Sequence, residues 1–97
     1  MEVLRPKELD THPGKELIPW ARAQLEIANS IIDNPGGGLL FATQTIGQVR
    51  SGLHERDAER WKELVGKLEQ AEDAAVHRNF DTARSLLGEV AAKLGSA

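Results

Sequence analysis

Three histidines are the residues best suited to catalysis or metal binding in this chain. His12, His54 and His77 are far apart in the sequence, and no two have the spacing that places a pair of metal ligands on one helix face. A carboxylate-bridged metal centre in a helical bundle needs Glu-x-x-His on two helices, and no such motif occurs. Asp73 lies four residues before His77, which could orient an imidazole but is also typical of a histidine meeting a helix dipole. We therefore predict no catalytic residue, no cofactor and no metal.

Histidine phosphotransfer is the enzymatic alternative, because such domains resemble this chain in size and in helical-bundle architecture. Their transfer helix carries His-x-x-Lys-Gly. In this chain His12-Pro13-Gly14-Lys15 is followed by Glu16, in a segment that proline and glycine keep out of a helix interior. His54-Glu55-Arg56 is similar to the start of a sensor-kinase H-box, although the downstream proline is missing. A phosphotransfer-like or other small helical enzyme module therefore stays as the alternative function.

The charge balance argues against binding to nucleic acid or to a membrane surface. The 97 residues include 12 Lys+Arg and 15 Asp+Glu, and neither half of the chain is basic, so the footprint of a phosphate-backbone binder is missing. The absence of cysteine excludes disulfides, thiolate zinc sites and a cysteine nucleophile. Residues 1–14 contain no apolar run of signal-peptide length, and we expect a soluble, cytoplasmic protein.

Apolar residues recur with one helical spacing in four separate stretches. The offsets 0, +3, +7, +10 and +14 keep one face of a helix apolar for four turns. The four stripes are Ile18, Ala21, Leu25, Ala28 and Ile32; Leu39, Ala42, Ile46, Val49 and Leu53; Trp61, Leu64, Leu68, Ala71 and Ala75; and Phe80, Ala83, Leu87, Val90 and Leu94. Four short amphipathic helices with short connections predict an all-α fold, a small antiparallel four-helix bundle.

Breaker residues place the predicted helices at roughly 15–33, 39–52, 56–77 and 80–94. Residues 33–38 (Asp-Asn-Pro-Gly-Gly-Gly) cannot continue a helix, Asn79 is a candidate N-cap, and Gly95 is a candidate left-handed cap. At Ser51-Gly52 we favour a break, because the third stripe is out of phase with the second; a helix continuing to His77 is the alternative. Residues 1–14 are expected to be extended or poorly ordered, and 15–97 to form one domain.

Two pairs on the polar helix faces have the spacing of intrahelical ion pairs. Glu63 precedes Lys67, and Glu89 precedes Lys93, by four residues each, in the favourable orientation. Such pairs contribute only a few tenths of a kcal/mol each, so we expect them to add little stability and not to determine the fold.

One segment resembles the opening of a MerR-type helix-turn-helix. Ile46-Gly47-Gln48-Val49 and then Ser51-Gly52-Leu53 are similar to the Ile-Gly-x-Val and Ser-Gly-Val elements of that motif, but are two residues closer together. The resemblance implies a turn at Ser51-Gly52 and a DNA-reading helix after it. That helix would carry Glu55, Asp57, Glu59 and Glu63, which phosphates would repel, so DNA binding ranks third.

Residues 64–94 resemble a tetratricopeptide helical hairpin. Ala71 and Ala74 stand where small residues pack in the first helix of that family, Phe80 opens the second helix, and Ala83 follows three residues later, at the closest contact. No second copy of the repeat precedes it, and a repeat array needs about three units. The resemblance therefore implies close, alanine-mediated packing of the last two helices.

Leu40 and Phe41 fall off the apolar stripe of their helix and are the candidate interface residues. A monomeric bundle cannot easily bury all of Leu39, Leu40, Phe41 and Ala42, unless Phe41 caps the core beside Trp20. The sequence thus predicts a non-enzymatic protein–protein interaction module, an adaptor, chaperone-like or inhibitor protein. Its expected partner is another protein of unknown identity, with a homodimer as one option.

Overall fold

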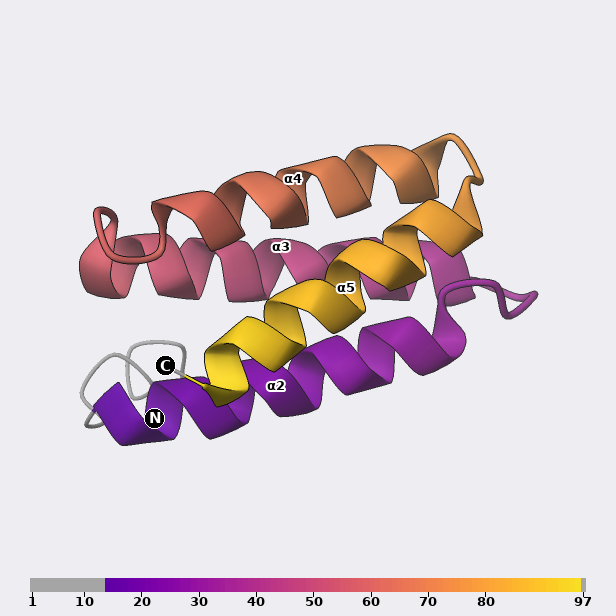
Figure 1. Ribbon diagram of the computed structural model, residues 1–97. Coiled ribbons are helices and arrows are strands. Elements are labelled where there is room, and N and C mark those ends of the chain that lie inside the picture. The colour runs from indigo at the N-terminus through magenta and orange to yellow at the C-terminus, as the bar shows by residue number, and fades with distance from the viewer. Residues whose placement is uncertain (1–13, 97) are drawn as a thin grey trace.

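The computed structural model describes residues 14–96 as four α-helices joined by short connections (Figure 1). The helices are α2 (Gly14–Ile31), α3 (Gly38–Asp57), α4 (Lys62–Val76) and α5 (Phe80–Gly95). Residues 14–96 contain no strand, and the predicted all-α four-helix architecture is confirmed. The predicted extended segment lies outside the described residues, apart from Gly14, which begins α2.

The four helices form a closed ring in which each helix packs against its two neighbours. α2 contacts α3, α3 contacts α4, α4 contacts α5, and α5 returns to contact α2. The chain alternates in direction from one helix to the next, and α5 runs obliquely across the front of the view (Figure 1). One end of the bundle therefore carries the α2–α3 linker and the α4–α5 turn, and the other carries the α3–α4 turn.

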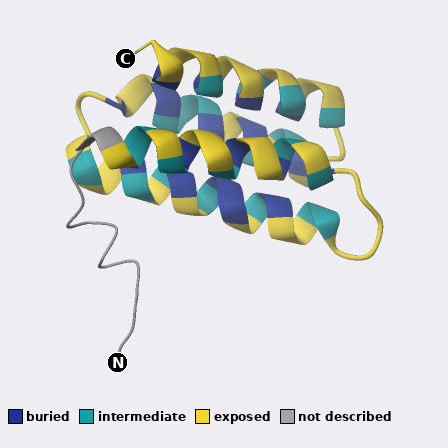
Figure 2. Cartoon of the chain, turned by 90° about the horizontal axis from the view of Figure 1, so that it is seen from below, coloured by how far each residue is buried: buried dark blue, intermediate teal, exposed yellow. Residues whose placement is uncertain are grey.

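The apolar stripes form the core. Every buried apolar residue in the described part of the chain is a stripe position, and the three remaining stripe residues, Ile18, Leu39 and Phe80, are partly buried against this core. Figure 2 shows the buried residues turned inward on all four helices. Ala71, Ala75 and Ala83 are fully buried in this core, and α4 packs against α5. Of the alanines named by the tetratricopeptide resemblance, Ala71 and Ala83 are therefore fully buried, whereas Ala74 is only partly buried.

The predicted helix break at Ser51-Gly52 is wrong. α3 continues through both residues to Asp57, so the turn on which the helix-turn-helix resemblance depends is absent. Gly52 serves close packing instead, because a Cβ atom there would lie 3.1 Å from a ring carbon of Trp20 on α2. A glycine that admits a neighbouring ring and a glycine that ends a helix look alike in a single sequence.

The phase change between the second and third stripes takes place six residues later, at residues 58–61. The Asp57 carboxylate accepts the Arg60 N–H at 3.1 Å, and the Asp57 carbonyl accepts the Trp61 N–H at 3.1 Å. The Arg60 guanidinium lies 4.4 Å from the centroid of the Trp61 ring, a cation–π contact. This turn sends α4 back along α3, so the alternative of one continuous helix to His77 is also wrong.

The helix ends depart from prediction at two further points. Gly95 is not left-handed; it is the last residue of α5, and a Cβ there would meet the Arg22 guanidinium at 3.1 Å. Asn79 is the N-cap of α5 but makes no side-chain cap hydrogen bond. Its N–H donates to the Ala74 carbonyl at 2.8 Å, which closes a Schellman ending on α4 with Arg78 in the left-handed region, at φ 63°.

Pro19 lies inside α2, which continues without interruption on both sides of it. Proline fits the first turn of a helix because the N–H groups there have no intrahelical partner. Pro19 is the sixth residue of α2, so its missing N–H leaves the Lys15 carbonyl without the usual donor. The residues before Pro19 belong to the same helix as the residues after it.

Candidate functional site

Both described histidines lie at helix ends and in solvent. His54 is in the last turn of α3, and His77 caps the C-terminus of α4. The His77 Nδ1 donates to the Asp73 carbonyl at 2.9 Å, and the Asp73 carboxylate is 3.6 Å away. His77 thus satisfies a terminal carbonyl of its helix, while His12 lies outside the described residues. Neither described histidine stands at the mid-helix position that the phosphotransfer alternative needs.

The charged residues of α4 and α5 pair between helices rather than within them. Lys93 Nζ lies 3.2 Å from Glu63, and Lys67 Nζ lies 3.5 Å from Glu89. The predicted pairs within each helix are therefore exchanged for two pairs across the α4–α5 contact. Each long side chain reaches its partner on the facing helix because the two helices pack closely.

Two further ion pairs join α4 to α3 and α5 to the α2–α3 linker. The Arg50 Nε donates to the Glu72 carboxylate at 2.6 Å, and this hydrogen bond raises the pKa of the Arg50 guanidinium above its ordinary value. The Arg84 Nη2 donates to the Asp33 carboxylate at 2.8 Å, and the Arg84 Nε to the Asn29 carbonyl at 3.4 Å. Charged groups therefore line the α3–α4, α4–α5 and α5–α2 contacts.

Four large apolar side chains remain exposed among the described residues, and all belong to the same half of the bundle. Leu40 is 64% exposed, Phe41 57%, Ile27 43% and Val76 63%. Leu40 and Phe41 are in the first turn of α3, Ile27 is one turn from the end of α2, and Val76 ends α4. The exposure of Leu40 and Phe41 agrees with their off-stripe positions, and the alternative in which Phe41 caps the core is wrong.

Ile27 and Phe41 flank the seam between α2 and α3. Ile27 shares a helical row with Trp20 and Ile31, which approach α3 at Gly52 and Gly38. Phe41 lies on the row of α3 that contains Gly52, the residue against which Trp20 packs. The two side chains therefore stand on facing sides of one seam, near the α2–α3 linker.

From residue 23 to 30 of α2 and from residue 40 to 51 of α3, the exposed positions that flank this seam carry no charge. We call them the hairpin face; they are Ala23, Ile27, Ser30, Leu40, Phe41, Gln44, Gln48 and Ser51. Between residues 27 and 49 the chain has a single charged residue, Asp33, and it pairs with Arg84 on α5. Arg22 and Glu26 of α2 lie on another row, where Arg22 packs against α5 at Gly95, whereas Glu16 shares the row of Ile27 but precedes Trp20, at the far end of the seam from the linker. The hairpin face is thus a continuous uncharged surface of two helices.

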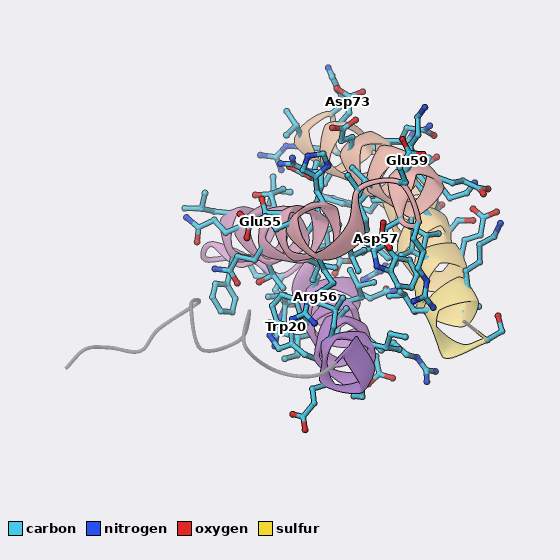
Figure 3. All side chains as sticks on the ribbon, turned by 90° about the vertical axis from the view of Figure 1, so that its left-hand side faces the viewer. Trp20, Glu55, Arg56, Asp57, Glu59 and Asp73 are labelled. Carbon is cyan, nitrogen blue, oxygen red and sulfur yellow. The ribbon has the colours of Figure 1, made fainter. Side chains whose placement is uncertain are left out.

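The opposite end of the bundle has the reverse character. Six of the seven residues from 54 to 60 are ionisable, and Figure 3 shows Glu55, Asp57 and Glu59 around the α3–α4 turn. The hairpin face ends where this charged turn begins. The hairpin face and the charged α3–α4 turn therefore offer different surfaces to a partner.

Other classes of site receive no support from the described residues. Within residues 14–96, no three His, Cys, Asp or Glu side chains gather as metal ligands. None of the helices in the same range combines the length and the apolarity that crossing a membrane requires. The chain matches no protein-family model, no curated protein and no solved structure. The hairpin face is the strongest candidate for a functional surface.

Proposed function

We propose that this protein is a non-enzymatic interaction module, of the adaptor, chaperone-like or inhibitor kind, that binds a protein partner through the hairpin face. The observation that carries the proposal is the exposure of adjacent Leu40 and Phe41, beside Ile27, on a surface without charge. Leaving a large apolar side chain in water forgoes about 1.5–3 kcal/mol, which a small domain can recover only by association.

The composition of the hairpin face agrees with that of a protein-binding surface. The buried centres of protein–protein interfaces are poor in charged residues and rich in aromatic ones. The polar hydroxyls of this face are small, and the Ser30 Oγ already donates to the Ile27 carbonyl at 2.9 Å. Covering this face with another protein would therefore leave few buried polar groups without a hydrogen-bond partner.

Affinity capture with matched variants tests this proposal. The wild-type chain and Leu40→Glu/Phe41→Glu are each used to capture proteins from an extract of the native cells. Gln70→Glu/Ala92→Glu, which adds the same two charges at exposed positions of α4 and α5, is the control. We expect a protein held by the wild type and the control but lost with the Leu40/Phe41 variant. Equal capture by all three proteins would refute the proposed surface.

A further inference from the structure

The hairpin face has a property that narrows the class of partner: it can face itself. In a two-fold dimer the same patch meets its own copy, so every side chain near the axis lies opposite an identical side chain. A charged residue there meets a like charge, which disfavours the dimer. The hairpin face has no charged residue to repel its copy.

We infer that the partner which covers the hairpin face is a second copy of this chain, bound about a two-fold axis that passes close to Gln44. This inference rests on the proposed function and names its partner. Gln44 is exposed one turn after Leu40 and Phe41, so an axis near it brings both apolar side chains against the other α3. The glutamine amide both donates and accepts, and it can therefore hydrogen-bond to its own copy, as no carboxylate or ammonium group can.

The other surfaces of the bundle are poorly suited to the same arrangement. An axis through the outer side of α4 or α5 would place groups such as Glu69, Asp81 or Glu89 near their own copies. An axis at the α3–α4 turn would bring together two sets of Glu55, Asp57 and Glu59 (Figure 3). A partner recognised by charge would need a charged site, which the hairpin face does not offer.

Analytical ultracentrifugation tests the dimer directly. We expect the wild-type chain to sediment as a monomer when dilute and as a species of twice that mass when concentrated. Because the interface holds no ion pair, the dissociation constant should change less than about threefold between 0.1 M and 1 M salt, although the Debye length falls from roughly 10 Å to roughly 3 Å. A dimer that dissociates with added salt would contradict the uncharged interface.

Charge introduced at the apolar residues should separate the two chains. Leu40→Glu/Phe41→Glu is expected to weaken the dimer about 100-fold or more, since large apolar anchors dominate such interfaces. Gln70→Glu/Ala92→Glu should leave the dissociation constant unchanged. All four positions are exposed, so circular dichroism should show the same helix content in every variant. A dimer that resists Leu40→Glu/Phe41→Glu would overturn the inference.

Opposite charges at Gln44 test the two-fold axis itself. Gln44→Glu and Gln44→Lys should each weaken self-association about tenfold or more, because like charges then face each other. An equimolar mixture of the two variants should regain the species of double mass. A mixture no more associated than either variant alone would show that Gln44 does not face its copy.

The failure of this inference differs from the failure of the proposed function. A wild type that stays monomeric up to about 1 mM overturns the homodimer. If capture from the cell extract then still depends on Leu40 and Phe41, the hairpin face binds a different protein and the proposed function stands. If neither self-association nor capture depends on those two residues, both the homodimer and the proposed function are refuted.

Discussion

The α2–α3 and α4–α5 hairpins bury the same apolar spacing but present different surfaces to solvent. The outer side of α4–α5 carries Lys67–Glu89 and Lys93–Glu63, pairs that tie the two helices to each other. The hairpin face of α2–α3 has Leu40 and Phe41 in solvent and no charged residue among its members. Burial of an apolar stripe therefore explains why each hairpin folds, while the remaining surface shows which hairpin is available for contact with another molecule.

Shortening a buried core side chain should have the largest effect on the free energy of unfolding, and the effect should be similar in the two hairpins. Leu68→Ala, Leu87→Ala and Ile46→Ala each remove a fully buried side chain, and each should lower the free energy of unfolding by about 2–5 kcal/mol. Such a loss could unfold a small domain. Leu40→Ala should change the free energy of unfolding by less than about 0.5 kcal/mol when the protein is dilute. The free energy is measured by urea denaturation, and losses below about 1 kcal/mol at both Leu68 and Leu87 would contradict the bundle register.

Two helical glycines should respond oppositely to the same substitution. Gly52→Leu drives a side chain against the Trp20 ring and should destabilise the chain by about 1–3 kcal/mol. Gly88→Leu, where no atom lies within 4 Å of a Cβ position, should stabilise α5 by up to about 1 kcal/mol through helix propensity. Thermal unfolding measures both. Equal shifts at the two sites would mean that Trp20 does not pack on Gly52.

The two hairpin connections differ in how they accommodate left-handed backbone. The α2–α3 linker uses Gly37, at φ 103°, whereas the α4–α5 turn uses Arg78, at φ 63°. Gly37→Ala should cost about 1–2 kcal/mol, because a Cβ disfavours this region. Arg78→Gly should stabilise by roughly 0.5 kcal/mol, since relief of that strain exceeds the added freedom of the unfolded chain. The free energies of unfolding are measured by chemical denaturation. A higher value for Gly37→Ala than for the wild type would contradict the left-handed backbone at Gly37.

Substitution of a polar residue should lower the free energy of unfolding where the residue forms an ion pair between helices, but not on the hairpin face. Glu72→Gln removes the charge that Arg50 binds at 2.6 Å and should cost about 1 kcal/mol, because the pair is only partly buried. Gln48→Ala should change the free energy of unfolding of dilute protein by less than about 0.5 kcal/mol. Differential scanning calorimetry compares the two. A larger loss for Gln48→Ala would mean that this face stabilises the monomer.

The apolar core was predictable from the sequence because a single spacing recurs in all four helices. Repetition at the helical period identifies the inward face of each helix without knowledge of its neighbours, and Leu25 or Val90 can be placed in this way. The exposure of Leu40 and Phe41 followed from the same argument, since a second apolar face has no place in a small bundle.

Features that depend on a neighbouring helix were not predictable. A glycine at position 52 is consistent both with a helix end and with close packing of Trp20. Only the position of α2 distinguishes the two roles. Glu63 and Lys93 are 30 residues apart, so sequence spacing favoured the nearer partners instead. The uncharged character of the hairpin face likewise required the helical rows of α2 and α3 to be placed side by side.

The central claim is that this protein makes its intermolecular contact through the hairpin face. Amide NMR spectra of the labelled chain, recorded from dilute to concentrated solution, test it residue by residue. We predict concentration-dependent shifts that centre on Ile27, Leu40, Phe41 and Gln44 and leave the outer sides of α4 and α5 unchanged. Shifts centred on α4, α5 or the α3–α4 turn would contradict the claim.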